Sequence, residues 1–271
     1  MIKYVSGSRC FVLTIITLCL VAAPVSAESS KTIKVFLLGG QSNMAGIGKA
    51  AKLQPPYSKP FSKVKIWDAK AQTWTNLSPA FDNKYGQFGP EISFGHAIAK
   101  VFSGEDIRLI KHAVGGTALY DDWDPKIKGD QYVILLKTAK AALAELDSSK
   151  VKYEISGMLW LQGESDAHEN KAETYEKNLS NFIEHMRMEF KTPQMPFIIA
   201  RVRNFYGGKT GQAKIVRDAQ VKVANTDKNV GWFDTDNCSM ANAGHYDAAG
   251  LIEIGKRFAA TFQEVVDEAK K

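Results

Sequence analysis

A serine in a glycine-rich turn is the sharpest chemical signal in this sequence. Ser42 stands in the run Gly-Gly-Gln-Ser-Asn-Met-Ala-Gly at residues 39–46, directly after an apolar stretch of strand length. A serine on a tight turn between a strand and a helix presents its hydroxyl at the edge of a sheet, beside backbone N–H groups that stabilise an oxyanion. The motif makes Ser42 a candidate nucleophile, with a simple turn or capping serine as the alternative.

The same run does not fit a phosphate-binding loop. That loop needs a glycine, four further residues, and then Gly-Lys followed by Ser or Thr. Counting back from Gly48-Lys49 puts Asn43 at the first glycine position, and Ala50 replaces the hydroxyl that would bind magnesium. Two of the required positions therefore fail.

A histidine near the end of the chain supplies a partner for the serine. His245 lies in Asn-Ala-Gly-His-Tyr-Asp at residues 242–247, just before the last amphipathic segment. A histidine in a loop on the carboxyl side of a parallel sheet can reach a serine there and act as its general base. From spacing alone, a helix-capping or surface histidine is the alternative.

Two middle segments offer donors for an oxyanion. Gly115 and Gly116 follow an apolar run and bring a backbone N–H close to a ligand; the sequence does not say which of them points inward. Gln162 ends another apolar run, and its amide can donate a hydrogen bond, whereas an ionised Glu164 cannot. Gln162 is therefore the side-chain donor that the sequence favours.

Alternating strands and helices must position these residues. Nearly continuous apolar runs of strand length alternate with amphipathic helical patterns, which predicts a mainly parallel sheet in a three-layer α/β/α sandwich. The irregular stretch at 49–89 is expected near the carboxyl ends of the strands, where open α/β sheets bind ligands. The predicted strands are 33–38, 64–67, 107–113, 155–161, 197–202 and 230–233, and the predicted helices are 91–102, 132–146, 169–190, 211–225 and 248–269.

The first 27 of the 271 residues have the pattern of a secretory signal. Lys3 and Arg9 precede an apolar run at 11–23, which is too short to span a bilayer, and Val-Ser-Ala at 25–27 fits a cleavage site. Cleavage would leave a single domain at 28–271, secreted or periplasmic, with no stable membrane insertion; a retained membrane anchor is the alternative. It would also reduce the formal charge from +6 to +4. The remaining Lys and Arg are scattered among acids, so no nucleic-acid partner is expected.

Five blocks together resemble the SGNH-hydrolase superfamily, and within it the sialate O-acetylesterase and acetylxylan esterase group (carbohydrate esterase family six). The resemblance implies a flavodoxin-like fold, no metal or organic cofactor, and hydrolysis of acetyl esters on a carbohydrate such as sialic acid or xylan. Ser42 would be the nucleophile that forms an acetyl-enzyme, and His245 its base. The N–H groups of Ser42 and Gly115 and the amide of Gln162 would form the oxyanion hole. The blocks are residues 40–44, 88–91, 115–117, 162–166 and 245–246, the last followed by 255–259.

One position departs from the family pattern. The family usually has an aspartate three residues before the histidine, and this chain has Asn242 there. Asn242 can orient the ring as a neutral acceptor, or Asp236 or Asp234 can supply the carboxylate, or the protein is a weakened catalyst. We expect an active enzyme in which Asp236 or Asn242 orients His245. A non-catalytic glycan-binding protein on this fold, or an esterase for lipids or thioesters, is the alternative.

The other histidines and an aromatic set have simpler interpretations. The remaining histidines show no metal-binding spacing and are expected to be surface or core residues. Four aromatic residues could form a platform for a sugar ring or pack into loops and core. The histidines are His96, His112, His168 and His185, and the aromatic residues are Tyr85, Phe88, Tyr120 and Trp123.

Overall fold

The computed structural model describes residues 1–4, 32–79, 85–168, 171–204 and 211–271. The predicted signal at 1–27 lies outside these ranges except for its first four residues, so cleavage after Ala27 and export stay predictions. Within the described ranges, no helix is both long enough and apolar enough to cross a bilayer.

A seven-stranded sheet forms the centre of the molecule, in the order β4-β3-β6-β1-β7-β8-β9. All neighbouring pairs are parallel except β3 with β4, which is antiparallel. A separate two-stranded sheet joins β2 and β5. The strands are β1 Ile33–Gly40, β2 Gly48–Lys49, β3 Phe61–Asp68, β4 Thr73–Leu77, β5 Gln87–Phe88, β6 Ile107–Ala113, β7 Tyr153–Leu161, β8 Phe197–Arg201 and β9 Val230–Asp234.

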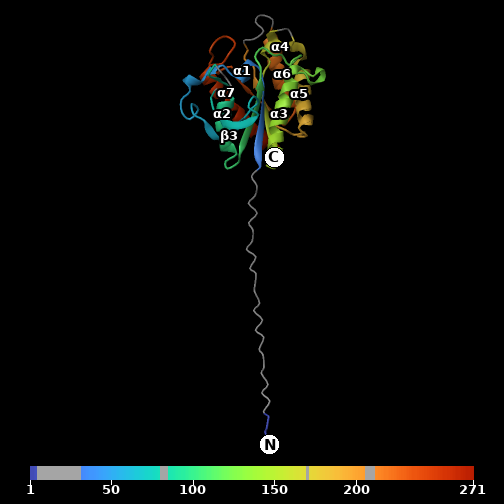
Figure 1. Ribbon diagram of the computed structural model, residues 1–271. Coiled ribbons are helices and arrows are strands. Elements are labelled where there is room, and N and C mark those ends of the chain that lie inside the picture. Colours follow the sequence, from blue (N-terminus) through green and yellow to red (C-terminus); the bar gives the residue numbers. More distant parts are fainter. Residues whose placement is uncertain (5–31, 80–84, 169–170, 205–210) are drawn as a thin grey trace.

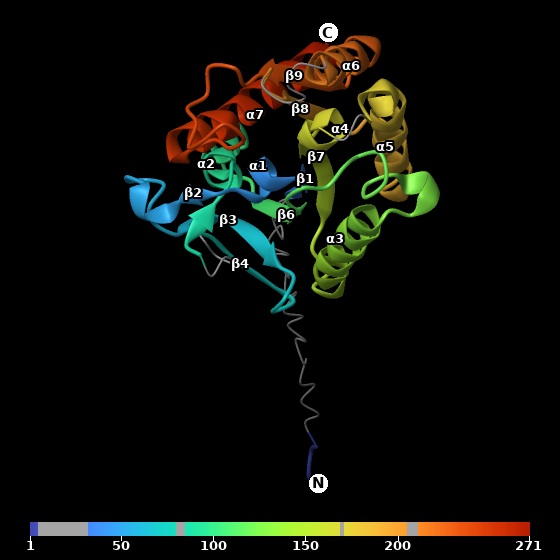
Figure 2. The same cartoon turned by 90° about the horizontal axis from the view of Figure 1, so that it is seen from above.

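Helices cover both faces of this sheet, which confirms the predicted three-layer α/β/α sandwich. In Figures 1 and 2, α2 and α7 lie on one face, and α3, α5 and α6 lie on the other. Each face carries its own cluster of buried apolar side chains. The helices are α1 Ser42–Ala45, α2 Glu91–Val101, α3 Asp130–Ser148, α4 Glu164–His168, α5 Tyr175–Glu189, α6 Gln212–Thr226 and α7 Ala248–Ala269.

The sequence of α7 determines which face of this helix packs on the core and where the helix begins. The buried residues of α7 recur every three or four positions, as a helix with one face on a core requires. Asp247 caps its start by accepting a hydrogen bond from the Gly250 N–H at 2.9 Å. The loop that ends at this cap carries His245, so the cap also fixes where that loop ends. The buried residues of α7 are Gly250, Leu251, Ile254, Gly255, Phe258, Ala259, Thr261, Phe262 and Val265.

Two sequence predictions differ from the structure. The stretch at 49–89 is not wholly irregular, because β3 and β4 form an antiparallel hairpin at the edge of the sheet. β4 buries only Leu77, so its apolar signal is weak. The helix predicted at 169–190 corresponds to α5, which begins only at Tyr175, and the separate short helix α4 at Glu164–His168 was not predicted. The Lys171 N–H donates to the Asp166 carbonyl just beyond α4, and a 3₁₀ turn at Ala172–Thr174 precedes α5.

The position of β1 determines where chemistry can occur. β1 lies between β6 and β7, and the chain passes to one side of it before returning to the other. Loops on the two sides of such a switch point diverge and leave a crevice at the carboxyl ends of the strands. The turn that carries Ser42 directly follows β1 and therefore opens into that crevice.

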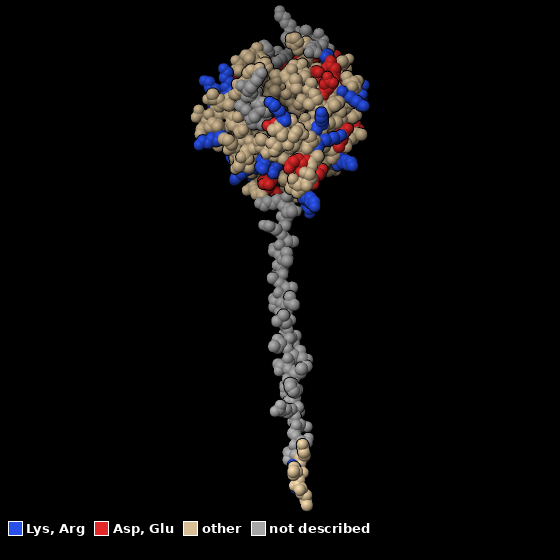
Figure 3. All heavy atoms as spheres, viewed as in Figure 1, with Lys and Arg blue, Asp and Glu red and all other residues tan. Residues whose placement is uncertain are grey.

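The face of the molecule drawn in Figure 3 carries charged side chains of both signs. On the face shown in Figure 3, Lys and Arg side chains lie among Asp and Glu side chains rather than apart from them. Such a mixture is typical of a solvated surface.

The close crossing of α2 and α7 predicts that adding a side chain at Gly255 lowers stability. A Cβ added at Gly255 would lie 2.1 Å from the Ser93 Oγ and 2.3 Å from the Pro90 carbonyl oxygen. Helix propensity alone would make Gly255→Ala stabilising by about 1 kcal/mol. We expect instead a loss of about 1–3 kcal/mol in the free energy of unfolding, measured with urea, because α2 must move. Lys256→Ala, at the exposed neighbour, is the control; a more stable Gly255→Ala protein would contradict the close packing.

Candidate active site

The turn after β1 is held tightly against the neighbouring strand. Gly40 has φ +149°, and a Cβ there would lie 2.2 Å from the Leu161 carbonyl oxygen, so only glycine fits. Gln41 donates its N–H to that same carbonyl at 3.1 Å. The carbonyl of Gln41 then accepts hydrogen bonds from the N–H groups of Met44 and Ala45. Ser42, the first residue of α1, is thereby fixed at the carboxyl edge of the sheet.

The structure brings Ser42, His245 and Asn242 into one chain of contacts. The His245 Nε2 lies 3.1 Å from the Ser42 Oγ, although the two residues are 203 positions apart. The His245 Nδ1 lies 3.2 Å from the Asn242 Oδ1. The serine and the base predicted from sequence are therefore adjacent, with an amide behind the ring.

The contacts of Asn242 also define the state of the imidazole. The Gly244 N–H donates to the Asn242 Oδ1 at 2.9 Å, which identifies that atom as an acceptor. The same atom faces the His245 Nδ1, so Nδ1 must carry the proton. Nε2 is then free to accept the hydroxyl proton of Ser42. This is the tautomer that a general base requires.

Asn43 joins the serine turn to the histidine loop. Its Nδ2 donates to the Gly244 carbonyl at 3.2 Å, and its Oδ1 accepts from the Tyr246 N–H at 3.2 Å. These contacts bracket His245 on both sides. Asn43 is only 1% exposed, so water does not compete for these bonds. The sequence prediction gave this side chain no role, although it stands next to Ser42 in the same motif.

A buried carboxyl group supports Asn43. The Glu164 Oε1 accepts from the Asn43 Nδ2 at 2.7 Å, and Glu164 is 4% exposed. Its Oε2 has no hydrogen-bond partner in the described part of the chain. Burial raises the pKa of the Glu164 carboxyl above its ordinary value, while the bond from Asn43 opposes this shift. Glu164 fixes Asn43 at an electrostatic cost from burial.

Gln162 does not lie where the sequence predicted. It is fully buried, and its Nε2 donates to the Thr117 carbonyl at 3.0 Å and to the Asp166 Oδ2 at 2.7 Å. The N–H groups of Leu119 and Tyr120 also donate to Asp166. Burial raises the pKa of Asp166 to about 6, although these donors oppose it. Because both N–H groups of its amide are used, Gln162 supports the loops and does not donate to an oxyanion.

Asp236 and Asp234 do not orient His245 either. The Asp236 carboxylate accepts two hydrogen bonds from the Arg217 guanidinium, at 2.9 and 2.8 Å. Asp234 pairs with Arg201. Burial acts to raise the pKa of Asp234, but the bonds from the Asp236 N–H and from Arg201 outweigh it and lower this pKa. Both carboxylates are thus neutralised by arginines. Of the three candidates, Asn242 is the one that contacts the ring.

A hollow of about 510 Å³ opens over the serine and histidine. A Cβ added at Gly115 would lie 3.3 Å from the Ser42 Cβ, so Gly115 directly faces Ser42. The backbone N–H groups of Ser42 and Gly115 have no hydrogen-bond partner among the described residues. They are available to a ligand. The hollow is lined by Gln41, Ser42, Gly115, Gly116, Glu164, Ser165, His168, Gly244 and His245.

A buried ion pair between β6 and α2 contacts the end of the serine turn. The Lys111 Nζ lies 2.7 Å from the Glu91 Oε2 and donates to the Ala45 carbonyl at 2.9 Å. The Glu91 Oε1 accepts from the Gly89 N–H at 2.9 Å. Glu91 therefore links α2 and β6 to the end of α1, which accounts for an acid at the start of α2.

The aromatic residues and His168, considered above from the sequence, differ in how far they are buried. His168 is exposed and lines the hollow, a position that sequence reasoning missed. Phe88 and Trp123 are buried and belong to the core, whereas Tyr85 and Tyr120 are exposed. In the described ranges, no group of three or more His, Cys, Asp or Glu side chains is placed to hold a metal ion.

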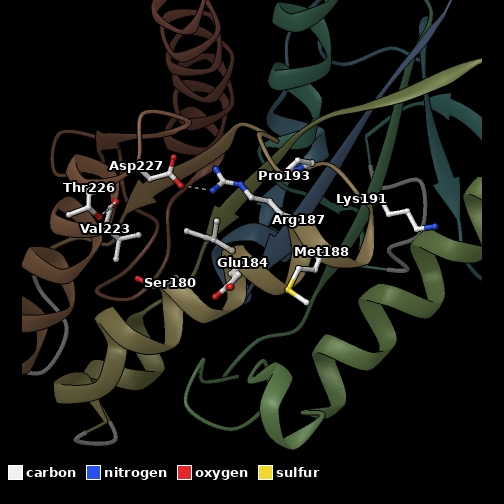
Figure 4. Close-up of a pocket in the computed structure, with 10 residues that line it drawn as sticks. Ser180, Glu184, Arg187, Met188, Lys191, Pro193, Val223, Thr226 and Asp227 are labelled. Carbon is white, nitrogen blue, oxygen red and sulfur yellow. Dashed lines mark hydrogen bonds and ion pairs between the residues drawn. The ribbon is translucent and has the colours of Figure 1, made fainter.

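A second hollow lies between α5 and α6 and has a volume of about 580 Å³ (Figure 4). Its arginine, Arg187, is paired with Asp227 and also donates to the Met195 carbonyl. Its serine, Ser180, donates to the Glu176 carbonyl at 3.0 Å. The residues that line it include no histidine. This hollow therefore lacks the serine–histidine pair that lines the first one.

Comparison with known proteins finds a matching family model and several relatives. Residues 32–264 match the family model described as carbohydrate esterase, sialic acid-specific acetylesterase. The chain is 29% identical over 207 residues to a probable carbohydrate esterase of Arabidopsis thaliana, covering 69% of this chain and 74% of that protein. The X-ray structure of that plant protein aligns with a TM-score of 0.72 at 25% identity, over 86% of this chain and 98% of that one.

Two further solved structures share the fold. The structure of NanS aligns with a TM-score of 0.68 at 14% identity, covering 89% of this chain and 99% of that one. A carbohydrate acetylesterase from Xanthomonas citri aligns with a TM-score of 0.62 at 20% identity, covering 87% of this chain and 56% of that one.

The bonds of Asn43 predict a large effect on stability. Asn43→Ala would leave the Gly244 carbonyl, the Tyr246 N–H and Glu164 without this partner. We expect a loss of about 2–4 kcal/mol in the free energy of unfolding, since each buried unsatisfied group costs about 1–3 kcal/mol. Urea denaturation measures it. Asn178→Ala removes a half-buried amide whose one side-chain hydrogen bond among the described residues goes to the Thr174 Oγ1, and it should cost less than about 0.5 kcal/mol. Equal losses in the two variants would contradict the role given to Asn43.

Proposed function

The chain belongs to the sialic acid-specific acetylesterase family of carbohydrate esterases, and from this premise we propose that it is a serine esterase that removes O-acetyl groups from a carbohydrate. The observation that carries the proposal is the 3.1 Å contact between the Ser42 Oγ and the His245 Nε2. A serine hydroxyl becomes a useful nucleophile only when such a base accepts its proton.

In the first half of the reaction, the Ser42 Oγ attacks the acetyl carbonyl while the His245 Nε2 takes the hydroxyl proton. The C=O bond becomes a C–O⁻ bond, and N–H donors stabilise the negative charge. The tetrahedral intermediate then expels the sugar oxygen, which receives the proton back from His245. The products are the sugar alcohol and an acetyl group esterified to Ser42.

In the second half, water replaces the sugar. His245 removes a proton from water, whose oxygen attacks the acetyl carbonyl and forms a second oxyanion in the same place. Collapse breaks the bond to Ser42, which regains its proton from His245, and releases acetate. Asn242 keeps the Nδ1–H oriented throughout, but it adds no negative charge to balance the imidazolium.

The sequence adds two elements to this proposal. We propose that the signal-like residues at 1–27 export the protein, so that it acts as a secreted or periplasmic enzyme. We also propose an acetylated sugar rather than a lipid or thioester as the substrate, because the family acts on carbohydrates. A pure glycan-binding role is the competing function, since a fold does not ensure chemistry.

Replacing the serine tests the nucleophile. We expect Ser42→Ala to lower acetate release from an acetylated sugar and from p-nitrophenyl acetate by at least 10³-fold, because no other group forms the acetyl-enzyme. Ser180→Ala, in the second hollow, should keep full activity. A fluorophosphonate probe should label the wild type at Ser42 and leave Ser42→Ala unlabelled. An active Ser42→Ala protein, or a wild type that is neither active nor labelled, would reject the esterase proposal.

Replacing the orienting amide tests Asn242 against Asp236. We expect Asn242→Asp to raise kcat about tenfold through the added charge, and Asn242→Ala to lower it by at least that factor. Asp236→Ala should leave kcat within threefold and lower stability instead, because Arg217 loses its two hydrogen bonds to Asp236. Steady-state kinetics and urea denaturation measure the two effects. A larger fall in kcat for Asp236→Ala than for Asn242→Ala would reverse the assignment.

A further inference from the structure

Gln41, the residue before the proposed nucleophile, has every hydrogen-bonding group accounted for except one. Its backbone N–H donates to the Leu161 carbonyl, and its own carbonyl accepts from two N–H groups of α1. Its side-chain Oε1 accepts from the N–H groups of Gly163 and Ser165, at 3.4 and 3.2 Å. The Nε2 group alone has no partner among the described residues.

The two backbone donors fix which way this amide points. The atom that faces the N–H groups of Gly163 and Ser165 must be the oxygen, so the NH₂ group faces the other way. Gln41 is only 4% exposed, yet it lines the same hollow as Ser42, Gly115 and His245. Among the described residues, its Nε2 has no partner and yet is not fully buried. The free N–H groups of Nε2 therefore open into the hollow.

We propose that the Gln41 Nε2 is the side-chain donor of the oxyanion hole, in the role that the sequence assigned to Gln162. The inference rests on the proposed esterase function. Gly115 follows β6, Ser42 follows β1, and the Gln41 amide is bonded to the residues that follow β7. Two of these donors therefore belong to the turn after β1 and one follows β6, and all three residues line the hollow beside the proposed nucleophile. A ligand oxygen that gains negative charge next to Ser42 meets all three.

The Gln41 amide is preorganised to stabilise an oxyanion. A donor that must rotate into place loses much of its effect, whereas a fixed donor stabilises charge as it develops. The bonds from the start of α4 remove the rotational freedom of the Gln41 amide before any substrate binds. A bond made only to the developing oxyanion raises kcat and leaves KM nearly unchanged.

Two substitutions at one position test this role. Gln41→Glu keeps an oxygen for the N–H groups of Gly163 and Ser165 and replaces the donor by an acceptor. Gln41→Met removes the donor without adding charge. We expect both to lower kcat by about 10²–10³-fold with KM within threefold, which is the usual effect of losing one oxyanion donor. Gln263→Glu, on the exposed side of α7, makes the same chemical change away from the site and should leave kcat unchanged.

The choice of substrate separates this role from sugar binding. The loss should be equal on p-nitrophenyl acetate and on an acetylated sugar, because both have the acetyl carbonyl. A loss confined to the sugar, or a KM increase at unchanged kcat, would overturn the oxyanion role, as would a kcat within threefold of wild type in Gln41→Met. Melting temperature confirms that each variant is folded. Fluorophosphonate labelling of wild-type Ser42 is the separate check on the esterase itself, so its failure would reject the proposed function and not only Gln41.

Discussion

The site depends on one buried side chain, the carboxamide of Asn43. The proposed nucleophile and its base lie 203 residues apart and on different elements, so no local segment holds them together. Asn43 bonds to the residues on either side of His245, and Glu164 holds Asn43 from the far side. Asn43 belongs to the same short helix as Ser42. The contacts that fix this helix therefore also fix the histidine loop, through the bonds of Asn43. The distance from serine to histidine is therefore set by the interior of the protein rather than by the exposed loop.

The rest of the fold supplies the rigid frame that this bond requires. β1 is held between β6 and β7, and the ends of these three strands bring together the turns at Ser42, Gly115 and Gly163. Lys111 and Glu91 support the turn from the side of α2. The histidine loop is secured in turn by Tyr246, whose hydroxyl donates to the Thr235 Oγ1 at 2.7 Å. Each support is a buried polar contact, and a buried network of this kind is rigid only when its members are satisfied.

The sequence predicted the architecture well because periodicity reports burial. The strand at 107–113 and the helix at 248–269 have the observed bounds, since the strand buries Ile107, Leu109 and Ile110 and the helix buries a regular face. β4 was missed because an edge strand with one buried residue leaves little apolar signal. In the site, the residue types and motifs predicted the serine and the histidine that lie together. They did not predict the roles of Gln162, Asp236 and the asparagine beside Ser42. The direction in which an amide or carboxylate points depends on partners far away in the chain.

The exposure of Asn242 has a consequence for how this protein tolerates change. Its side chain contacts one ring nitrogen and one N–H group, and it lies at the surface. Most groups that tune a catalytic base are buried, so that altering them also costs stability. Here the side chain that orients the proposed base can be changed at a position on which the core does not depend. Activity and folding are thus separable at residue 242, which makes it a site where turnover can evolve, or be engineered, without a matching loss of stability.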